Sequence, residues 1–486
     1  MNQFKKITEK KHQRILSGGV PRTLDLFAGC GGLSLGFEMA GFQTIGAVEH
    51  DREASRSHAL NFMSHLEVDL FEIHARSKDI IALEPEELMS MLGYSGKAED
   101  QVDVIIGGPP CQAFARVGRA KLREVASHPE AFLKDPRGNL YLRYLDYVRR
   151  LKPIAIVMEN VPDVLNYGGH NIAEETCEIL DSWGYRCGYT LLNSVFYGVP
   201  QMRERMFLVA IAKPIGTSIN FPHPTHWFDL PKGYADARKM ALQTVSTRDK
   251  SFFIPAVPAS KEHLKPATTA KDALNDLPLL KEHLTEGLPK YPKRTVSLLS
   301  YRKVIPTSYA KIMREWRSEI SNQVADHVIR NQPRDFPIFK CMKPGDEYPQ
   351  AHAIAQQLFQ EKLSAYASAH GKQPHKSSSI YKEIQKATVP PYDFTKFPNK
   401  WRKMEPDAPA RTLMAHLGKD CYSHIHYDSN QARTISIREA ARLQSFPDRF
   451  QFFGSMGAAF RQIGNAVPPL VAMNIAQCLL AELVSG

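Results

Sequence analysis

The chain has 486 residues, of which 43% are hydrophobic and 23% are charged. This length allows two or three domains of ~150 residues, each able to bury a core. No run approaches the ~20 consecutive apolar residues of a membrane span, and the polar, basic start lacks the apolar segment of a signal peptide. We therefore expect a cytoplasmic protein. Its seven cysteines include no C-x-x-C pair, which favours neither a disulfide framework nor a structural zinc site.

The positive charge is concentrated in one part of the chain. The net charge is +11, and residues 213–410 alone hold 31 Lys and Arg against 19 Asp and Glu. The same segment holds 21 of the 33 prolines. Phosphate contacts supply most of the affinity of nucleic-acid binders, so this composition indicates a DNA- or RNA-binding domain joined to a nearly neutral catalytic domain. A solvated basic surface without a ligand would give the same counts.

The first apolar run, Thr23 to Phe27, leads into a glycine-rich turn at 28–32 and then into helical spacing of apolar residues. The pattern predicts a strand, a loop and a helix. A second apolar run ends in Glu49, 20 residues after Gly29, where nucleoside-binding α/β units place the acid that holds ribose hydroxyls. Ser34 stands where a dinucleotide fingerprint needs glycine, which makes a nicotinamide oxidoreductase the weaker alternative. A tight turn without a ligand is the other alternative.

Two further predicted strands, 102–106 and 154–158, also end in polar residues. The first leads into Gly107-Gly-Pro-Pro-Cys111 and the second into Glu159. Ligands bind at the carboxyl edge of an open parallel sheet, so we expect Glu49, Cys111 and Glu159 to share one crevice. Burial as a small hydrophobe is the alternative for Cys111, but a loop stiffened by two prolines is a poor place to bury a cysteine.

Seven motifs follow one another in a fixed order. They are Asp25-Leu-Phe-Ala-Gly-Cys-Gly-Gly-Leu33, Glu49 with Asp51, Gly108-Pro-Pro-Cys-Gln112, Glu159-Asn-Val161, Gln201-Met-Arg-Glu-Arg205, Arg438-Glu-Ala-Ala-Arg-Leu-Gln-Ser-Phe-Pro-Asp448 and Gln462-Ile-Gly-Asn-Ala-Val-Pro-Pro469. In this series the chain resembles the DNA (cytosine-5)-methyltransferase family, and in particular its bacterial type II modification enzymes. One departure is Phe114-Ala115, where the family commonly has serine after the aromatic residue; we expect a modest effect on loop closure.

The resemblance implies a fold and a division of the chain. The fold is α/β, a Rossmann-like S-adenosylmethionine-dependent methyltransferase domain with a mixed sheet, plus a smaller irregular target-recognition domain. We expect a basic leader at 1–20, the catalytic domain at 21–212, the target-recognition domain at 213–410, and a segment at 411–486 that completes the catalytic domain.

The resemblance also implies the chemistry. Carbon 5 of cytosine is a poor nucleophile until another nucleophile adds to carbon 6, and a thiolate suits that addition best among side chains. Cys111 takes this role, Glu159 protonates or hydrogen-bonds ring nitrogen 3, and Arg203 and Arg205 hold the base carbonyl and the loop. The cytosine must first rotate out of the duplex, and the polar residues 115–134 would form a loop that closes over it.

The cofactor implied is S-adenosyl-L-methionine, which leaves as S-adenosyl-L-homocysteine. Phe27 would stack on adenine, Glu49 would hold the ribose and Asp69 would lie near the exocyclic amine. The full expected set is Phe27, Ala28, Gly29, Gly31, Gly32, Leu33, Glu49, Asp69, Pro109, Leu140, Asn465 and Val467. No metal is expected, because His424 and His426 have no evident third ligand.

The end of the chain predicts scaffold helices. Ser436 and Glu439 form a capping box that opens a helix through Leu443, and an apolar terminal helix starts at Pro468.

The expected partner is double-stranded DNA, bound by a monomer, with a cognate restriction endonuclease as a second partner that the family allows. Two alternatives stay open: a methyltransferase of the same fold that acts on transfer RNA, and a DNA-binding protein that has lost catalysis. The long basic segment favours DNA over RNA, and the presence of Cys111, Glu159, Arg203 and Arg205 favours an active enzyme. The sequence does not reveal which DNA sequence is recognised.

Overall fold

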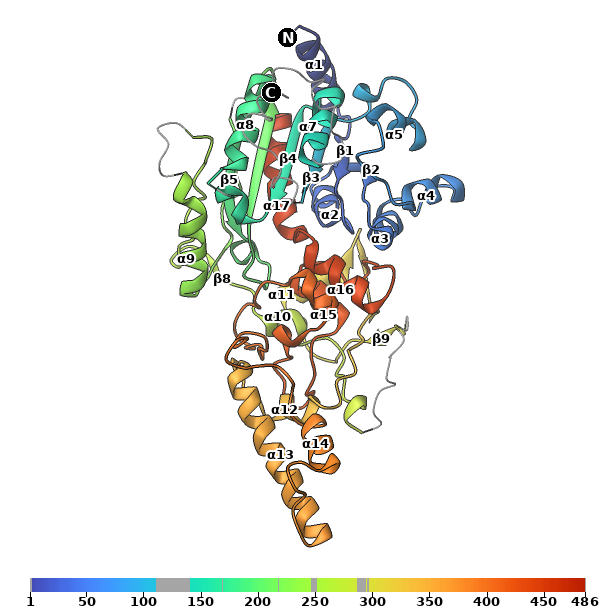
Figure 1. The fold of residues 1–486 in the computed structure, drawn as a ribbon. Helices are drawn as coiled ribbons and strands as arrows, with labels where there is room; N and C mark the ends of the chain where they lie inside the picture. Colours follow the sequence, from blue (N-terminus) through green and yellow to red (C-terminus); the bar gives the residue numbers. More distant parts are fainter. Residues whose placement is uncertain are drawn as a thin grey trace. The chain divides into compact units, whose positions relative to one another are not determined.

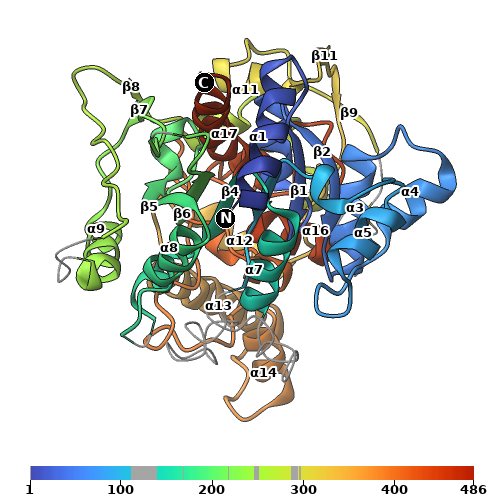
Figure 2. The same cartoon turned by 90° about the horizontal axis from the view of Figure 1, so that it is seen from above.

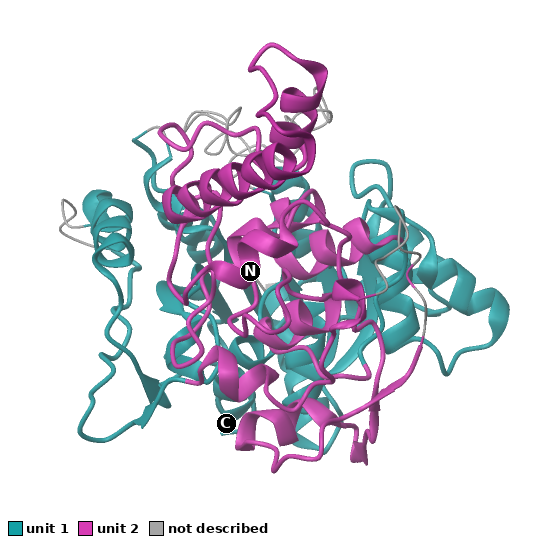
Figure 3. Ribbon diagram, turned by 90° about the horizontal axis from the view of Figure 1, so that it is seen from below, with its two compact units in different colours: residues 1–267, 450–454, 465–486 teal, residues 268–449, 455–464 magenta. Residues whose placement is uncertain are grey.

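A computed structural model describes residues 2–110, 140–167, 169–216, 218–245, 251–285, 294 and 297–485. The chain divides into two compact units, coloured separately in Figure 3. Unit 1 comprises residues 1–267, 450–454 and 465–486, and unit 2 comprises residues 268–449 and 455–464.

Unit 1 is an α/β domain. Its strands are β1 (Arg22–Leu26), β2 (Gln43–Val48), β3 (Val104–Gly107), β4 (Ala155–Asn160), β5 (Tyr185–Asn193), β6 (Glu204–Ala212), β7 (His226–Trp227) and β8 (Lys265–Pro266). Its helices are α1 (Asn2–Leu16), α2 (Gly32–Met39), α3 (Arg52–Phe62), α4 (Val68–Ala75), α5 (Pro85–Met91), α7 (Leu140–Leu151), α8 (Ile172–Ser182), α9 (Lys232–Ala241) and α17 (Pro469–Val484).

The main sheet of unit 1 has six strands in the order β2-β1-β3-β4-β6-β5. Strands β1 to β4 are mutually parallel, whereas β6 is antiparallel to both of its neighbours. The predicted mixed sheet is therefore confirmed. The four predicted strands are all present, each within two residues of its predicted start. The fourth continues through Asn160, so Glu159 lies inside β4 rather than beyond it.

Helices cover both faces of this sheet. Helices α7 and α8 lie on one face and α17 lies on the other (Figure 2), and α2 packs against α17. The strand order explains why helices lie on both faces. The chain crosses from β1 to β2 in one direction along the sheet and from β3 to β4 in the opposite direction, so the helices that connect these strands lie on opposite faces. The core between these layers is apolar and includes Leu24, Ile105, Tyr144, Ile156 and Leu208.

The expected terminal helices are confirmed. Helix α17 buries Val471, Ile475, Leu479 and Leu483 along one stripe. The stretch 456–484 has the length and hydropathy of a membrane span, but it consists of two helices, and 56% of its most apolar window is buried within the protein. An apolar core helix accounts for it.

Unit 2 is irregular (Figure 1). Apart from α13, its helices are short, its two strand pairings are also short, and much of its chain forms loops. Its helices are α10 (Ala270–Leu274), α11 (Ser308–Arg314), α12 (Phe336–Cys341), α13 (Tyr348–His370), α14 (Ser379–Lys386), α15 (Ile437–Leu443) and α16 (Met456–Asn465), whose last residue belongs to unit 1. Its strands are β9 (Leu299–Ser300), β10 (Glu315–Trp316), β11 (Glu319–Ile320) and β12 (Gln323–Val324). An aromatic cluster that includes Phe339, Tyr348, Trp401 and Tyr422 forms a core at the base of α13.

The boundaries of the two compact units differ from those predicted from proline content and charge. Residues 213–267 pack with unit 1, and residues 411–449 pack with unit 2. The predicted leader forms α1, which belongs to unit 1: Lys11 Nζ donates to the backbone carbonyls of Val102, Leu151 and Lys152. Proline content and charge describe the composition of a segment, whereas the compact units reflect which segments of the backbone pack together.

Candidate active site

The glycine-rich loop between β1 and α2 is shaped by left-handed backbone conformations. Phe27 has φ 62°, Gly29 φ 55° and Gly31 φ 100°. Glycine adopts such angles without strain, whereas the left-handed Phe27 is uncommon. The backbone N–H groups of Phe27 and Ala28 both donate to the carbonyl of Val48, at 2.8 and 3.2 Å, which fixes the loop to the end of β2.

Glu49 joins this loop to the next helix. Its Oε2 accepts from the N–H of Gly29 at 2.8 Å, and its Oε1 accepts from the N–H of Asp51 at 2.7 Å. Burial raises the pKa of Glu49, while these backbone donors oppose the rise. Each carboxylate oxygen keeps a further lone pair, so the side chain can still accept from two hydroxyl groups of a ligand.

The last motif reaches the glycine loop through a close helix contact. A Cβ atom on Gly32 would lie 2.2 Å from the carbonyl oxygen of Val467, and one on Gly36 would lie 2.4 Å from the Cβ of Ala472. Only glycine permits this approach of α2 to α17 and the segment before it. The structure thus brings Val467 beside Gly32, although 435 positions separate them in sequence.

The third and fourth strands bring a second group of predicted residues together. A Cβ on Gly108 would lie 3.1 Å from Oε2 of Glu159, so this side chain lies against the backbone of the loop that follows β3. Asn160 Nδ2 donates to the carbonyl of Pro109 at 2.7 Å. Pro109 is therefore attached to the end of β4.

The two predicted arginines lie at the start of β6: Arg203 directly precedes the strand, and Arg205 is its second residue. Because β6 is antiparallel to β4, its first residues lie at the same edge of the sheet as the carboxyl ends of β1 to β4. Arg205 Nε lies 3.0 Å from Oε1 of Glu159. Burial raises the pKa of Glu159 above its usual range, against the opposing charges of Arg205 and then Arg203. Sequence spacing alone did not reveal this ion pair, because it depends on the reversed direction of β6.

Cys111 and the expected closing loop 115–134 lie outside the described residues. The described chain ends at Pro110 and begins again at Leu140, the first residue of α7. The cysteine of the glycine loop, Cys30, is buried, and burial raises the pKa of its thiol, which disfavours a thiolate there.

Two of the expected cofactor residues have exposed side chains. Asp69 is exposed on the first turn of α4, and Asn465 is exposed at the end of α16. By contrast, the N–H of Lys78 donates to the carbonyl of Glu49 at 2.7 Å, which brings the following residue, Asp79, to the carboxyl end of β2. Asp79 was not among the predicted residues; the apolar pair that follows it, Ile80-Ile81, is the one local sequence signal.

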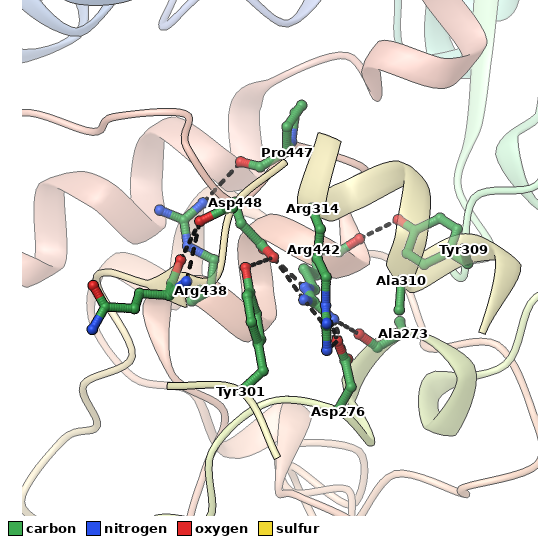
Figure 4. A network of polar contacts seen from close by, with 12 residues as sticks. Ala273, Asp276, Tyr301, Tyr309, Ala310, Arg314, Arg438, Arg442, Pro447 and Asp448 are labelled. Carbon is green, nitrogen blue, oxygen red and sulfur yellow. Dashed lines mark hydrogen bonds and ion pairs between the residues drawn. The ribbon is translucent and has the colours of Figure 1, made fainter. Parts of the chain in front are cut away.

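The motif Arg438 to Asp448 lies in unit 2 and forms a buried polar network (Figure 4). Arg442 Nη2 donates to Asp448 Oδ2 at 2.6 Å, and Arg442 also pairs with Asp276. Tyr301 Oη donates to Asp448 at 2.6 Å, and Arg314 pairs with Asp276. The capping box of Ser436 and Glu439 is confirmed, with both reciprocal hydrogen bonds present. The charged network was not predicted.

The six-stranded mixed sheet, with its glycine loop, Glu49 and the Glu159–Arg205 pair at one edge, defines unit 1 as an α/β methyltransferase domain. The model of the family of C-5 cytosine-specific DNA methylases matches residues 21–481 of the chain. The chain belongs to this family and is a DNA (cytosine-5)-methyltransferase.

Similar proteins agree with this assignment. M.OihORF3336P of Oceanobacillus iheyensis, named as a type II methyltransferase, is 38% identical over 470 residues, which cover 96% of this chain and 97% of the relative. The type II methyltransferase M.AgeI of Thalassovita gelatinovora is 29% identical, with 94% and 99% covered. A crystal structure of a DNA modification methyltransferase encoded within a prophage of E. coli shares the fold, with a TM-score of 0.55, 21% identity, and 94% and 98% of the two chains covered.

Proposed function

We propose that this enzyme methylates carbon 5 of a cytosine that has been rotated out of a specific double-stranded DNA sequence, with Cys111 as a transient covalent nucleophile. The observation that carries the proposal is the Glu159–Arg205 pair against Gly108, because it fixes an acid and a guanidinium beside the loop that leads to Cys111. Relatives named as type II methyltransferases support a role in restriction and modification of DNA.

The cofactor would be S-adenosyl-L-methionine, which supplies an electrophilic methyl group. The loop fits such a ligand: a Cβ on Gly29 would meet nothing within 4 Å, so the space above the loop is open, and Glu49 offers further lone pairs beside it. Phe27, Ala28, Gly31, Leu33 and the segment around Val467 would form the walls. As the residue that binds the adenine amine, we propose Asp79 as a candidate in addition to Asp69. Asp79 directly follows Lys78, whose N–H donates a hydrogen bond to the carbonyl of Glu49.

The residues of this chain would act in a fixed order. The thiolate of Cys111 bonds to carbon 6 of the ring, and the displaced electron pair makes carbon 5 nucleophilic. Glu159, whose raised pKa favours the protonated form, donates its proton to ring nitrogen 3. After carbon 5 is methylated, a base removes the proton on carbon 5, the electrons of that bond re-form the double bond between carbons 5 and 6, and the bond between sulfur and carbon 6 breaks. Ring nitrogen 3 returns its proton to the Glu159 carboxylate, so the thiolate and the acid are both regenerated. Arg203 and Arg205 would hold the ring carbonyl and keep Glu159 oriented.

The substrate class can be tested with a tritiated methyl donor. Purified enzyme should label unmethylated duplex DNA and leave transfer RNA unlabelled, and bisulfite sequencing of the product should show protection at one recurring sequence. Label on transfer RNA but not on duplex DNA would contradict the proposal.

A further inference from the structure

Unit 2 carries a helical hairpin formed by the distal half of α13 and by α14, residues 359–388, which we call the α13–α14 arm. The proximal half of α13 buries Tyr348, Ala351 and Ala355 in the aromatic core of unit 2. Beyond them, Phe359 packs on Tyr381 of α14, with ring centroids 5.2 Å apart. The arm is thus anchored at one end, and Figure 1 shows it extending away from the other helices of unit 2.

The ends of the two helices are well defined. Gly371, with φ 78°, closes α13 in a left-handed conformation, and Ser378 caps α14 by accepting from the N–H of Tyr381. Thr388 Oγ1 donates to the carbonyl of Ile384 where the arm returns to unit 2. These hydrogen bonds make the arm a formed element rather than a loose loop.

The arm presents unpaired positive charge. Its five lysines are all exposed, against only two glutamates. They are Lys362, Lys372, Lys376, Lys382 and Lys386. Within the described part of the chain, none of these five lysines forms an ion pair. Lys382 and Lys386 are four residues apart and therefore share one face of α14.

Three arginines of unit 2 outside the arm are, by contrast, neutralised by acidic partners. Arg433 pairs with Glu439, Arg294 with Asp326, and Arg442 with two aspartates. The middle segment, residues 213–410, carries a positive excess of 31 Lys and Arg over 19 Asp and Glu. The arm holds a share of it that can still interact with an anionic partner.

We propose that the α13–α14 arm binds the phosphate backbone of duplex DNA without reading bases. The inference rests on the proposed function, since DNA is the substrate. Lysine is a flexible point charge that suits phosphate contacts, and the arm contains no arginine, the side chain that most often reads guanine. Such contacts raise the affinity for any DNA duplex, whereas the DNA sequence is recognised by other residues that contact the bases.

The test compares two variants in which the same number of charges is removed. The arm variant carries Lys372→Gln, Lys376→Gln, Lys382→Gln and Lys386→Gln. The control carries Lys5→Gln, Lys6→Gln, Lys10→Gln and Lys97→Gln, which lie in unit 1 on or near α1. Lys11 of helix α1 donates to backbone carbonyls that precede β3 and β4. These carbonyls lie at the edge of the sheet opposite the candidate site. All eight lysines are exposed, so both variants should fold, which circular dichroism and thermal unfolding would check.

Binding to a random-sequence DNA duplex is measured by fluorescence anisotropy over a range of NaCl concentrations. The plot of log affinity against log salt should become shallower by about 0.9 for each phosphate that the arm variant no longer neutralises, and it should stay unchanged in the control. The KM for DNA should rise and kcat should stay near that of the wild type. Bisulfite sequencing should show the same methylated sequence for both.

Each other result contradicts the proposal in a distinguishable way. An unchanged salt dependence in the arm variant would show that the arm does not bind phosphates. A changed methylated sequence would show that the arm reads bases. If the wild-type protein methylates no duplex DNA, the proposed function itself fails, whatever the arm does.

Discussion

Single residues determine the chemistry, and Glu159 is the one whose environment is most informative. It lies inside β4, against Gly108 and paired with Arg205, and burial raises the pKa of its carboxyl. A raised pKa keeps more of the acid protonated near neutral pH. Burial therefore increases the protonated fraction that can supply ring nitrogen 3, and the charges of Arg205 and Arg203 oppose this increase.

Replacing this acid should slow catalysis without unfolding the protein. We expect Glu159→Gln to lower kcat by about 10²- to 10⁴-fold, because the amide can hydrogen-bond to the ring but cannot protonate it. In the wild type, kcat should fall as the pH rises through the pKa of Glu159, and this dependence should be absent from the variant. Steady-state methylation across pH tests both. Calorimetry with S-adenosyl-L-homocysteine provides the control, since cofactor affinity should be unchanged.

The buried Arg442 gives a prediction about stability. Removing one member of a buried charge network leaves the buried charges that remain less well compensated, which costs about 3–5 kcal/mol. Arg442→Met leaves Asp448 and Asp276 buried without this partner, so the free energy of unfolding in urea should fall by that amount. The exposed pair of Arg449 and Glu319 is the matched control: Arg449→Met should cost about 1 kcal/mol or less. Equal destabilisation of the two variants would contradict the network's role.

The limits of sequence reasoning are also clear for single residues. Residues at strand ends could be predicted, because apolar runs followed by glycine, proline or an acid identify those ends. The Glu159–Arg205 pair and the position of Asp79 could not, because both depend on strand direction and on backbone hydrogen bonds between distant segments. Asp69, chosen from a short and common pattern, lies exposed on a helix.

Among the elements, the contact of α2 with α17 joins the two ends of the catalytic sequence. Gly36→Ala should be destabilising by about 1–3 kcal/mol, because the new Cβ would lie 2.6 Å from the carbonyl of Pro469 and 2.4 Å from Ala472. Affinity for S-adenosyl-L-homocysteine should also fall, since the position of Val467 depends on this helix packing. Thermal unfolding and calorimetry measure the two effects.

The control for this substitution lies in α9. A Cβ on Gly233 would meet nothing within 4 Å, so Gly233→Ala should be neutral or stabilising by up to about 1 kcal/mol. A Gly36→Ala variant as stable as this control would show that the helices can separate without cost.

Strands and capped helices were the elements most open to prediction. The four buried strands, the capping box at Ser436 and the apolar stripe of α17 all follow from local patterns. Strands β5 and β6 were not located individually, although Met206 to Ala212 is an apolar run like those of the predicted strands. The reversed direction of β6 could not be predicted, because an apolar run does not indicate strand direction. The arm of α13 and α14 likewise had no signal beyond its charge.

For the whole molecule, pH should affect stability through buried histidines. Burial lowers the pKa from 6.5 to about 4 for His327 and His424 and to about 3 for His58 and His426. The unfolded chain therefore binds more protons than the folded chain below pH 6.5, so stability is complete above that pH and decreases as the pH falls toward about 4.

We expect each histidine to cost about 1 kcal/mol for each pH unit below 6.5. The Tm should accordingly fall steadily in thermal scans from pH 6.5 to 4.5. A constant Tm over this interval would contradict the burial of these side chains.

The division of the molecule was the least predictable feature. Composition predicts a binding segment at 213–410, whereas residues 213–267 belong to the same compact unit as the catalytic sheet and residues 411–449 belong to unit 2. Charge and proline content report on the surface of a segment, and they carry little information about which core it helps to form.

The covalent role of Cys111 is the central claim, and trapping with 5-fluorocytosine tests it most directly. Duplex DNA that carries this base at the methylated position, incubated with the enzyme and S-adenosyl-L-methionine, should give a complex that survives denaturing electrophoresis, because fluorine on carbon 5 prevents the elimination that releases the enzyme. Cys111→Ala should abolish the complex while still binding DNA. A denaturation-resistant complex formed by Cys111→Ala, or none formed by an active wild-type enzyme, would contradict the account.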